Sequence, residues 1–222
     1  MPTQMKIVLA PNTFKESLPA QEVCRAMREG ILRAGFEGEI VLVPLADGGD
    51  GTIDALVAAT HGEIRSVPVS DPLGRPVQAR YGILGSGDTA VIEMAEASGL
   101  WRIKQQDRNP LQTSTKGTGE LIRAALEEGI RDFIIGIGGS ATVDGGSGMA
   151  EALGYRFLDS ASNPVKPNGG NLRKISKIDI AGVCRELRET RFRVACDVSN
   201  PLLGPEGAAE VFGPQKGATA EM

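Results

Sequence analysis

Two segments rich in glycine and aspartate constrain the fold of this chain most. The first spans residues 47–52 (DGGDGT) and follows the apolar run 41–45. The second spans residues 136–148 (GIGGSATVDGGSG) and follows the apolar run 133–135. A helical pattern comes after each segment. Loops that join a buried strand to a helix predict an α/β fold, in which ligands bind at the carboxyl ends of the strands.

The composition of these loops indicates phosphate chemistry. Consecutive glycines let the backbone approach a ligand closely and turn several N–H groups toward an anion. Carboxylates among such donors repel a bare phosphate but suit a phosphate that carries Mg²⁺. Asp47 and Asp50 are close enough to share a hydrated Mg²⁺, or one of them can take a proton from an attacking hydroxyl. The alternative is an aspartate turn in which Asp50 caps the next helix.

The overall composition excludes several other classes of protein. The 222 residues carry a net charge of −4 with acids and bases interspersed, so we expect neither nucleic acid nor an anionic membrane as a partner. No apolar run approaches the length of a membrane span, and the N-terminus lacks a signal-peptide core. Cys24, Cys184 and Cys196 have no metal-like spacing. Reduced thiols in a cytoplasmic protein are the expectation.

The chain begins with the pattern of a β-α-β unit. Strands are expected at residues 6–10 and 39–43, joined by a helix that Ser17 caps and Gly35 ends. A right-handed crossover of this kind makes the two strands parallel.

The pattern changes to alternation after Gly62, which is the expected boundary between a domain at 1–62 and a second α/β domain at 63–222. Strands 65–69 and 77–84 flank the turn at residues 71–74 and should pair antiparallel. Further strands are expected at residues 89–94, 133–135 and 191–196, with a helix that begins at Thr118 and ends at Gly129.

Three polar residues stand at other predicted strand ends. Lys15 follows the first strand and is either a phosphate clamp or a solvated surface charge. Asp197 and Asn200 follow the last strand, where they are either metal or base candidates or turn formers. No P-loop sequence and no catalytic loop of the protein kinases is present, and His61, at a predicted helix end, is the single histidine.

A dinucleotide-dependent oxidoreductase is a second interpretation of the longer loop. Gly136, Gly138 and Ala141 fit a dinucleotide fingerprint, and Asp159 stands about 20 residues on, where an acid would bind ribose. Against this interpretation, Asp144 and the neighbouring glycines interrupt the helix that would receive the pyrophosphate.

Taken together and in this order, the segments resemble the bacterial glycerate kinases, which phosphorylate D-glycerate with ATP. The resemblance runs from Met5 to the end, and two positions depart from the familiar pattern: Asp50 replaces a common glutamate, and Lys116 stands where an aromatic residue is usual. The matching stretches are residues 6–18, 44–52, 90–100, 117–122, 136–148, 196–205 and 211–217.

The resemblance implies two α/β domains with a cleft between them. The first domain, Rossmann- or flavodoxin-like, is discontinuous in the family, whose members continue well beyond Met222. We therefore expect residues 1–62 to be the N-terminal part of an incomplete domain. The 222-residue chain alone is expected to be inactive, and a non-catalytic anion-binding fragment is a third interpretation.

The resemblance also implies ATP, Mg²⁺ and D-glycerate as ligands. The first two strands and their helix cannot cover both faces of a parallel sheet, so we expect an exposed apolar face there, with a homodimer formed through it as one possible assembly. Within this scheme Asp47 and Asp197 are the candidates for the general base, and Lys15 neutralises charge on the transferred phosphoryl group. Asp50 and Asp144 are expected near the metal. The expected substrate- and phosphate-binding residues are Gly48, Gly49, Gly138, Gly139, Ser140 and Asn200.

Overall fold

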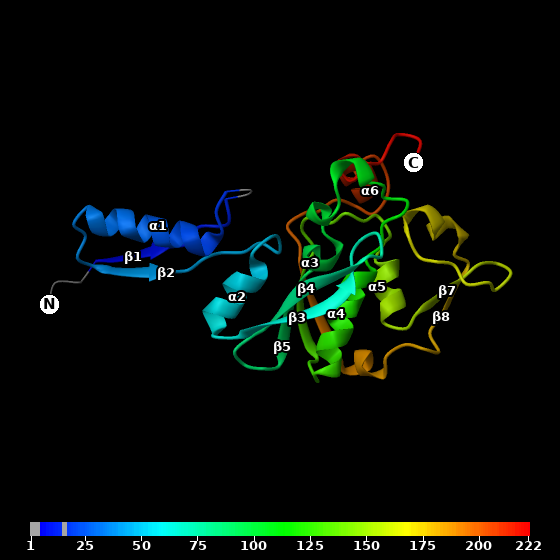
Figure 1. Ribbon diagram of the computed structural model, residues 1–222, viewed down its shortest axis with the longest axis horizontal. Coiled ribbons are helices and arrows are strands. Elements are labelled where there is room, and N and C mark those ends of the chain that lie inside the picture. The colour runs from blue at the N-terminus through cyan, green and yellow to red at the C-terminus, as the bar shows by residue number, and fades with distance from the viewer. Residues whose placement is uncertain (1–4, 15–16) are drawn as a thin grey trace.

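The computed structural model describes residues 5–14 and 17–222. A narrow N-terminal part projects from a larger body that holds most of the chain (Figure 1). Strands and helices alternate through both parts, so the predicted α/β class is confirmed. Among the described residues, no helix is both long enough and apolar enough to cross a membrane.

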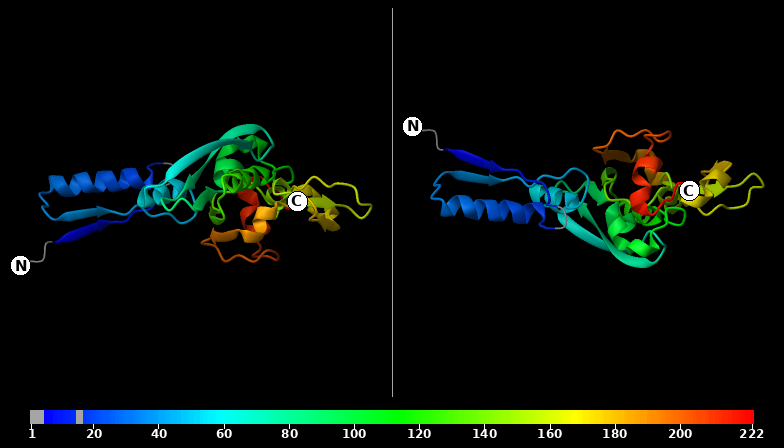
Figure 2. Two further views of the ribbon diagram at one scale, coloured as in Figure 1. Left: turned by 90° about the horizontal axis from the view of Figure 1, so that it is seen from below. Right: turned by 90° about the horizontal axis from the view of Figure 1, so that it is seen from above.

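The narrow part is the predicted β-α-β unit. Strand β1 (Lys6–Leu9) pairs parallel with β2 (Glu39–Leu42), and α1 (Ala20–Arg33) connects them. Figure 2 shows α1 running along one side of the two strands. The prediction that Ser17 caps α1 is wrong: Pro19 occupies the N-cap position, where its fixed φ and extended ψ lead the chain into the helix without a side-chain hydrogen bond.

The larger body is built on a five-stranded mixed sheet. The antiparallel hairpin predicted around residues 71–74 is confirmed. The sequence predicts no pairing for the later strands, of which three pair parallel. The strands occur in the order β3 (Glu63–Ser70), β4 (Pro76–Ile83), β5 (Thr89–Glu93), β6 (Asp132–Gly136) and β9 (Arg191–Ala195).

Helices and one small hairpin complete the larger body. The helices are α2 (Thr52–Thr60), α3 (Ala95–Ser98), α4 (Lys116–Glu127), α5 (Ser147–Ala152) and α6 (Ala208–Phe212), and the hairpin joins β7 (Arg156–Leu158) to β8 (Lys177–Asp179). The prediction that Thr118 caps α4 is wrong, because Thr115 holds the N-cap position and Thr118 lies buried in the first turn. There the Thr118 hydroxyl hydrogen bonds to that of Ser98 at 2.8 Å.

The central strands of the five-stranded sheet are buried on both faces, whereas the edge strand β9 is largely exposed. A large cluster that includes Tyr81 and Phe133 packs with Leu121 of α4, and a smaller one on the other face joins Val91 to Ile53 of α2. Burial on both faces is what a parallel sheet requires. The division of the chain at residue 62 stays a prediction, and α2, which precedes it, packs on the larger sheet.

Candidate active site

The two glycine-rich loops touch each other at the carboxyl ends of the parallel strands. The N–H of Gly138 donates to the carbonyl of Gly48 at 3.2 Å. Gly48, at φ +89°, also lies against the last residue of β9, since a Cβ there would stand 2.7 Å from the Ala195 carbonyl oxygen. Glycine is required at this position by both its backbone angle and its close contact. Three of the predicted loops therefore meet at one place, namely those that follow β2, β6 and β9.

Asp47 presents an exposed carboxylate that two neighbours hold in place. Its Oδ1 accepts the N–H of Gly49 at 3.0 Å, and its Oδ2 accepts the side-chain amide of Asn12 at 2.9 Å. Asn12 follows β1, so the loop after β1 also reaches the site. The sequence predicts a role for Lys15 in this loop but none for Asn12. These bonds orient the Asp47 carboxylate.

Asp50 is exposed near the tip of the same loop and does not cap the next helix. The N-cap residue of α2 is Gly51 in a left-handed conformation (φ +91°), so the turn-and-cap interpretation of Asp50 is wrong. The Asp50 backbone carbonyl accepts the Thr13 hydroxyl at 3.2 Å, which ties the loop after β1 to this one. The Asp50 carboxylate lies toward Gly139, with Oδ1 3.8 Å from where a Cβ of that glycine would stand.

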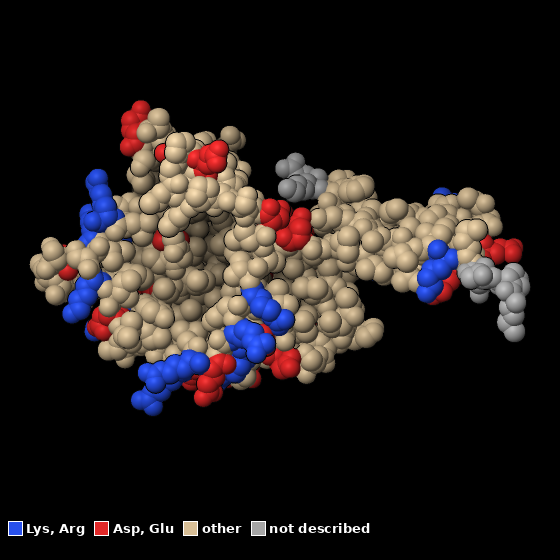
Figure 3. Space-filling model, turned by 180° about the vertical axis from the view of Figure 1, so that it is seen from behind, with Lys and Arg blue, Asp and Glu red and all other residues tan. Residues whose placement is uncertain are grey.

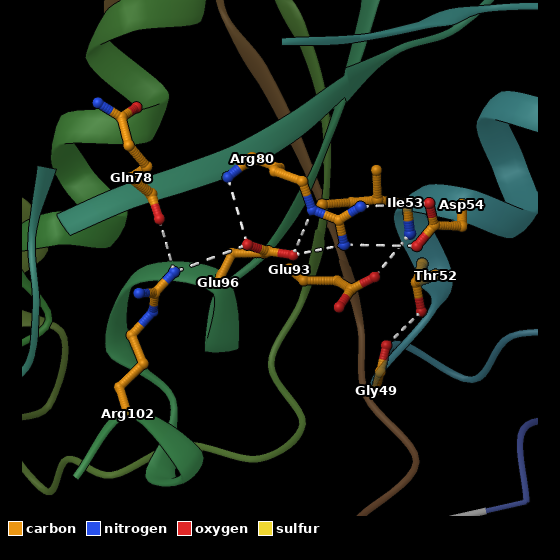
Figure 4. A network of polar contacts seen from close by, with 9 residues as sticks. All are labelled: Gly49, Thr52, Ile53, Asp54, Gln78, Arg80, Glu93, Glu96 and Arg102. Carbon is orange, nitrogen blue, oxygen red and sulfur yellow. Dashed lines mark hydrogen bonds and ion pairs between the residues drawn. The ribbon is translucent and has the colours of Figure 1, made fainter. Parts of the chain in front are cut away.

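Glu93 takes the capping role instead. It ends β5 with 5% of its surface exposed, and its Oε1 accepts the N–H of Ile53 at 2.7 Å (Figure 4). Burial raises the pKa of Glu93 to about 7, and the charges of Glu96 and Asp50 act in the same direction. A buried carboxylate at the amino end of α2 fixes the point where the 47–52 loop enters its helix.

An ion-pair network beside Glu93 fixes α2 on the sheet. Arg80 of β4 donates to Glu96 of α3 at 2.7 and 2.9 Å and to Asp54 of α2 at 3.3 Å (Figure 4). Arg102 lies on the other side of Glu96, 3.8 Å from its carboxylate. No local pattern predicts a role for these residues, although Glu93 and Glu96 belong to the matching stretch 90–100.

Asp144 organises the longer loop from within. It is 1% exposed, and its Oδ2 accepts both the N–H and the hydroxyl of Thr115, at 2.8 and 2.9 Å. The N–H groups of Gly146 and Gly148 donate to its two oxygens. Because protein donors engage both oxygens, a structural role explains Asp144 better than the predicted metal role. Among the described residues, no group of three or more acidic, histidine or cysteine side chains is arranged to hold a metal.

The same loop does not have the geometry of a dinucleotide site. The fingerprint needs a helix that begins directly at its glycines, but α5 begins only at Ser147 and has six residues. Asp159 accepts hydrogen bonds from Ala161 and Asn163 in its own turn. The interpretation based on Gly136, Gly138, Ala141 and Asp159 is therefore wrong.

The remaining predicted residues differ in what they offer a ligand. The N–H of Gly138 is engaged by Gly48, whereas in the described part of the chain no protein acceptor is found for the N–H groups of Gly139 and Ser140. Asp197 is exposed just after β9, and the Asn200 side chain closes its own loop by donating to the Glu206 carbonyl at 2.9 Å. Lys15 lies outside the described residues.

Charge and shape agree with a ligand site at this edge. Figure 3 shows acidic side chains where the narrow part joins the larger body, and the surface of the larger body is hollowed beside them. Exposed carboxylates next to free backbone N–H groups are the donor set for a phosphate that carries a divalent cation.

Comparisons with known proteins agree on one family. The model of the glycerate kinase family matches residues 7–222. The glycerate kinase of Bacillus subtilis (strain 168) is 53% identical over 98% of this chain and 57% of its own length. The glycerate 2-kinase of Escherichia coli (strain K12) is 51% identical over the same shares. A crystal structure from Salmonella typhimurium LT2, assigned as glycerate kinase 2, matches 99% of this chain and 59% of its own at 51% identity and a TM-score of 0.89. The chain thus spans somewhat more than half the length of these relatives.

Proposed function

The chain belongs to the glycerate kinase family, and we propose that the full-length protein transfers the γ-phosphoryl group of ATP to D-glycerate. The observation that carries the proposal is the contact between Gly48 and Gly138. This contact places the exposed carboxylate of Asp47 beside the loop whose N–H groups at Gly139 and Ser140 are free for an anion.

The reaction requires a base and a site for negative charge. A glycerate hydroxyl attacks the γ-phosphorus, an O–P bond forms, and the bond from that phosphorus to the bridging oxygen breaks, so that ADP leaves. The hydroxyl proton passes to a carboxylate, for which Asp47 and Asp197 are the two candidates. Gly139 and Ser140 bind a phosphate or the glycerate carboxylate, and we retain for Lys15 the proposed role of neutralising the transferred group.

Magnesium fits the exposed end of the 47–52 loop. We call residues 136–148 the anion-binding loop. Asp50 would hold the ion, because its carboxylate is exposed and faces this loop at Gly139. The bound ion would offset the charge of the triphosphate. A site with few protein ligands suits Mg²⁺, which keeps several waters and binds through the phosphates as well.

The 2-hydroxyl of glycerate is the proposed acceptor, on the strength of the name of the Escherichia coli relative. We also propose a cytoplasmic location, which the free thiols of Cys24, Cys184 and Cys196 support. The division of the chain at residue 62 remains part of the proposal, because β1 and β2 form a sheet separate from the larger one.

Phosphorus NMR of the products tests the activity and the acceptor together. The full-length protein is incubated with ATP, Mg²⁺ and D-glycerate, and the spectrum is recorded with proton coupling. A phosphate on C2 couples to one proton and gives a doublet, whereas a phosphate on C3 couples to two and gives a triplet. A doublet confirms the proposal, a triplet moves the acceptor to C3, and ATP left unchanged contradicts kinase activity.

A calorimetric titration separates the remaining alternatives. If Mg-ATP binds but no phosphoglycerate forms, the result supports the interpretation as an anion-binding protein without catalytic activity. Binding of NAD but not of Mg-ATP would contradict the phosphotransfer proposal itself.

A further inference from the structure

A lysine from the C-terminal part of the chain is inserted beneath the anion-binding loop. Lys216 ends the short 3₁₀ segment Pro214–Lys216, and its side chain is buried, with 8% of the residue exposed. Its ammonium donates to the hydroxyl oxygen of Ser140 at 2.6 Å and to the carbonyl of Thr142 at 2.7 Å. These residues are 76 and 74 positions away in the sequence.

Neighbouring contacts hold the lysine in this position. Arg108 donates to the carbonyl of Gln215 at 3.2 Å, on the residue before Lys216. Gly217, at φ +91°, packs so closely on the backbone of Arg108 that a side chain there would overlap with it. The fold of the neighbouring backbone therefore holds Lys216 in this buried position.

The hydrogen bond from Lys216 determines which way the Ser140 hydroxyl can donate. An ammonium group only donates, so the Ser140 oxygen must be the acceptor of the 2.6 Å bond. The hydroxyl hydrogen of Ser140 is then directed away from Lys216 and is free to donate. Because the positive charge of Lys216 polarises the Ser140 oxygen, this O–H becomes a stronger donor to an anionic oxygen.

We propose that Lys216 is a positioning residue for substrate binding, which turns the Ser140 hydroxyl into a donor toward an anionic oxygen of the ligand. The proposal rests on the proposed function, because it deepens the role of the same loop. That oxygen belongs either to a phosphate of ATP or to the carboxylate of glycerate, and separate titrations distinguish these two sources.

The charge on Lys216 also predicts how binding depends on pH. Burial lowers the pKa of the Lys216 ammonium to about 8, while the carboxylate of Asp144 acts in the opposite direction. The Asp144 carboxylate acts on this ammonium, and Arg108 packs on the two residues that flank Lys216. As the pH rises above 8 the free protein loses this charge, so ligand affinity should fall. An arginine at this position would keep its charge across that range.

Matched substitutions in the full-length protein test the proposal. Lys216→Met removes the ammonium, Lys216→Arg keeps a charged donor, and Lys174→Met is the control. The Lys174 ammonium donates to the side-chain oxygen of Asn171 at the exposed end of its own 3₁₀ segment, Gly169–Lys174. Binding of Mg-ATP and of D-glycerate is measured separately by calorimetry between pH 7 and 9.5, and melting temperatures are recorded for each variant.

We expect Lys216→Met to weaken one of the two ligands by about ten-fold or more at pH 7, and Lys174→Met to leave both unchanged. The wild type should lose affinity above pH 8, whereas Lys216→Arg should recover binding without that loss. Unchanged affinity for both ligands in a folded Lys216→Met variant would overturn the proposal.

Ser140→Ala keeps the test decisive where Lys216→Met does not fold. This variant removes the hydroxyl and retains the bond from Lys216 to the Thr142 carbonyl. It should weaken the same ligand, and a double variant should add little to either single change. Normal affinity in Ser140→Ala would overturn the inference. If the wild type binds Mg-ATP but forms no phosphoglycerate, the proposed function fails and the binding arm still tests Lys216.

Discussion

The narrow N-terminal part and the larger body show how differently two sets of parallel strands in one chain can be supported. The central strands of the five-stranded sheet are packed on both faces, by α4 on one and α2 on the other, although Val194 of the edge strand β9 is 58% exposed. Within residues 5–14 and 17–42, α1 is the single helix that packs on β1 and β2, and Val8 remains 55% exposed. A parallel sheet is stable when both faces are covered, so the larger body should hold most of the folding free energy.

The candidate site contains residues from both the narrow part and the larger body. Asp47 follows β2 of the narrow part, yet its loop is fixed by the larger body through the contact of Gly48 with Gly138 and through Glu93 at the start of α2. The rigid part therefore positions the acid, and the less supported part delivers Asn12 to it. A site arranged in this way can change shape at the N-terminal part without loss of the anion-binding loop.

The largest effect on stability is expected at the centre of the larger body. Phe133 is fully buried and stacks on Phe192 at 5.2 Å between ring centroids. Phe133→Ala should lower the free energy of unfolding by about 3–5 kcal/mol, because it removes apolar contacts and leaves a cavity. Urea denaturation measures this loss.

Hydrogen exchange under the same conditions sharpens the comparison, with Leu9→Ala as the matched change in the narrow part. Phe133→Ala should lower protection throughout the larger body, whereas Leu9→Ala should lower it only near β1, β2 and α1. Equal loss of protection everywhere in Leu9→Ala would contradict the idea that the two parts differ in stability.

The second effect concerns catalysis and asks which region supplies the base. Asp47→Asn and Asp197→Asn keep the size and shape of the side chain but remove its charge, and Asp47→Asn also replaces one of two acceptor oxygens by an amide donor. In the full-length enzyme we expect kcat to fall about 100-fold or more for the residue that accepts the proton. A loss confined to Asp47→Asn assigns the base to the loop after β2, and one confined to Asp197→Asn assigns it to the loop after β9. Near-normal kcat in both variants would remove both from the chemistry.

A third effect depends on pH and lies where the two regions join. The folded state raises the pKa of Glu93 from 4.5 to about 7, so its favourable contribution is fully present below pH 4.5 and is lost as the pH rises through 7. Glu93→Gln keeps an oxygen for the N–H of Ile53 but cannot ionise. The stability of the wild type relative to this variant should fall by roughly 1–3 kcal/mol between pH 4.5 and 8.

Urea denaturation at several pH values measures that difference, and Glu29→Gln, on the exposed face of α1, serves as the control. A flat difference between the wild type and Glu93→Gln would show that Glu93 titrates normally. The fixed entry of α2, and hence the rigid support of the 47–52 loop, would then need another explanation.

The sequence predicted those parts of the fold that local patterns determine. Alternation around the turn at residues 71–74 predicted the hairpin of β3 and β4, and the glycine loops marked the functional edge of the sheet. The cap at Ser17 failed for a local reason, since the backbone of Pro19 starts α1 without a side-chain hydrogen bond. The cap at Thr118 failed because a long-range partner decides it: Thr115 starts α4 with help from Asp144, 29 residues away. Glu93 and Lys216 were missed for the same reason, since no local pattern reveals a partner 40 or 76 residues distant.

The smallest effect tests the exposed sheet directly, through one chemical change made in both regions. Val8→Thr and Val91→Thr each replace a methyl group by a hydroxyl of similar size, and threonine retains the preference for a strand. Val91 lies fully buried in β5, so its variant should lose about 1–3 kcal/mol of unfolding free energy from burying a hydroxyl. Val8 is exposed to solvent, and its variant should change that free energy by less than about 0.5 kcal/mol. Urea denaturation of the 222-residue chain gives both values. If Val8→Thr cost as much as Val91→Thr, then β1 would be covered in solution, and the difference between the two sheets would not exist.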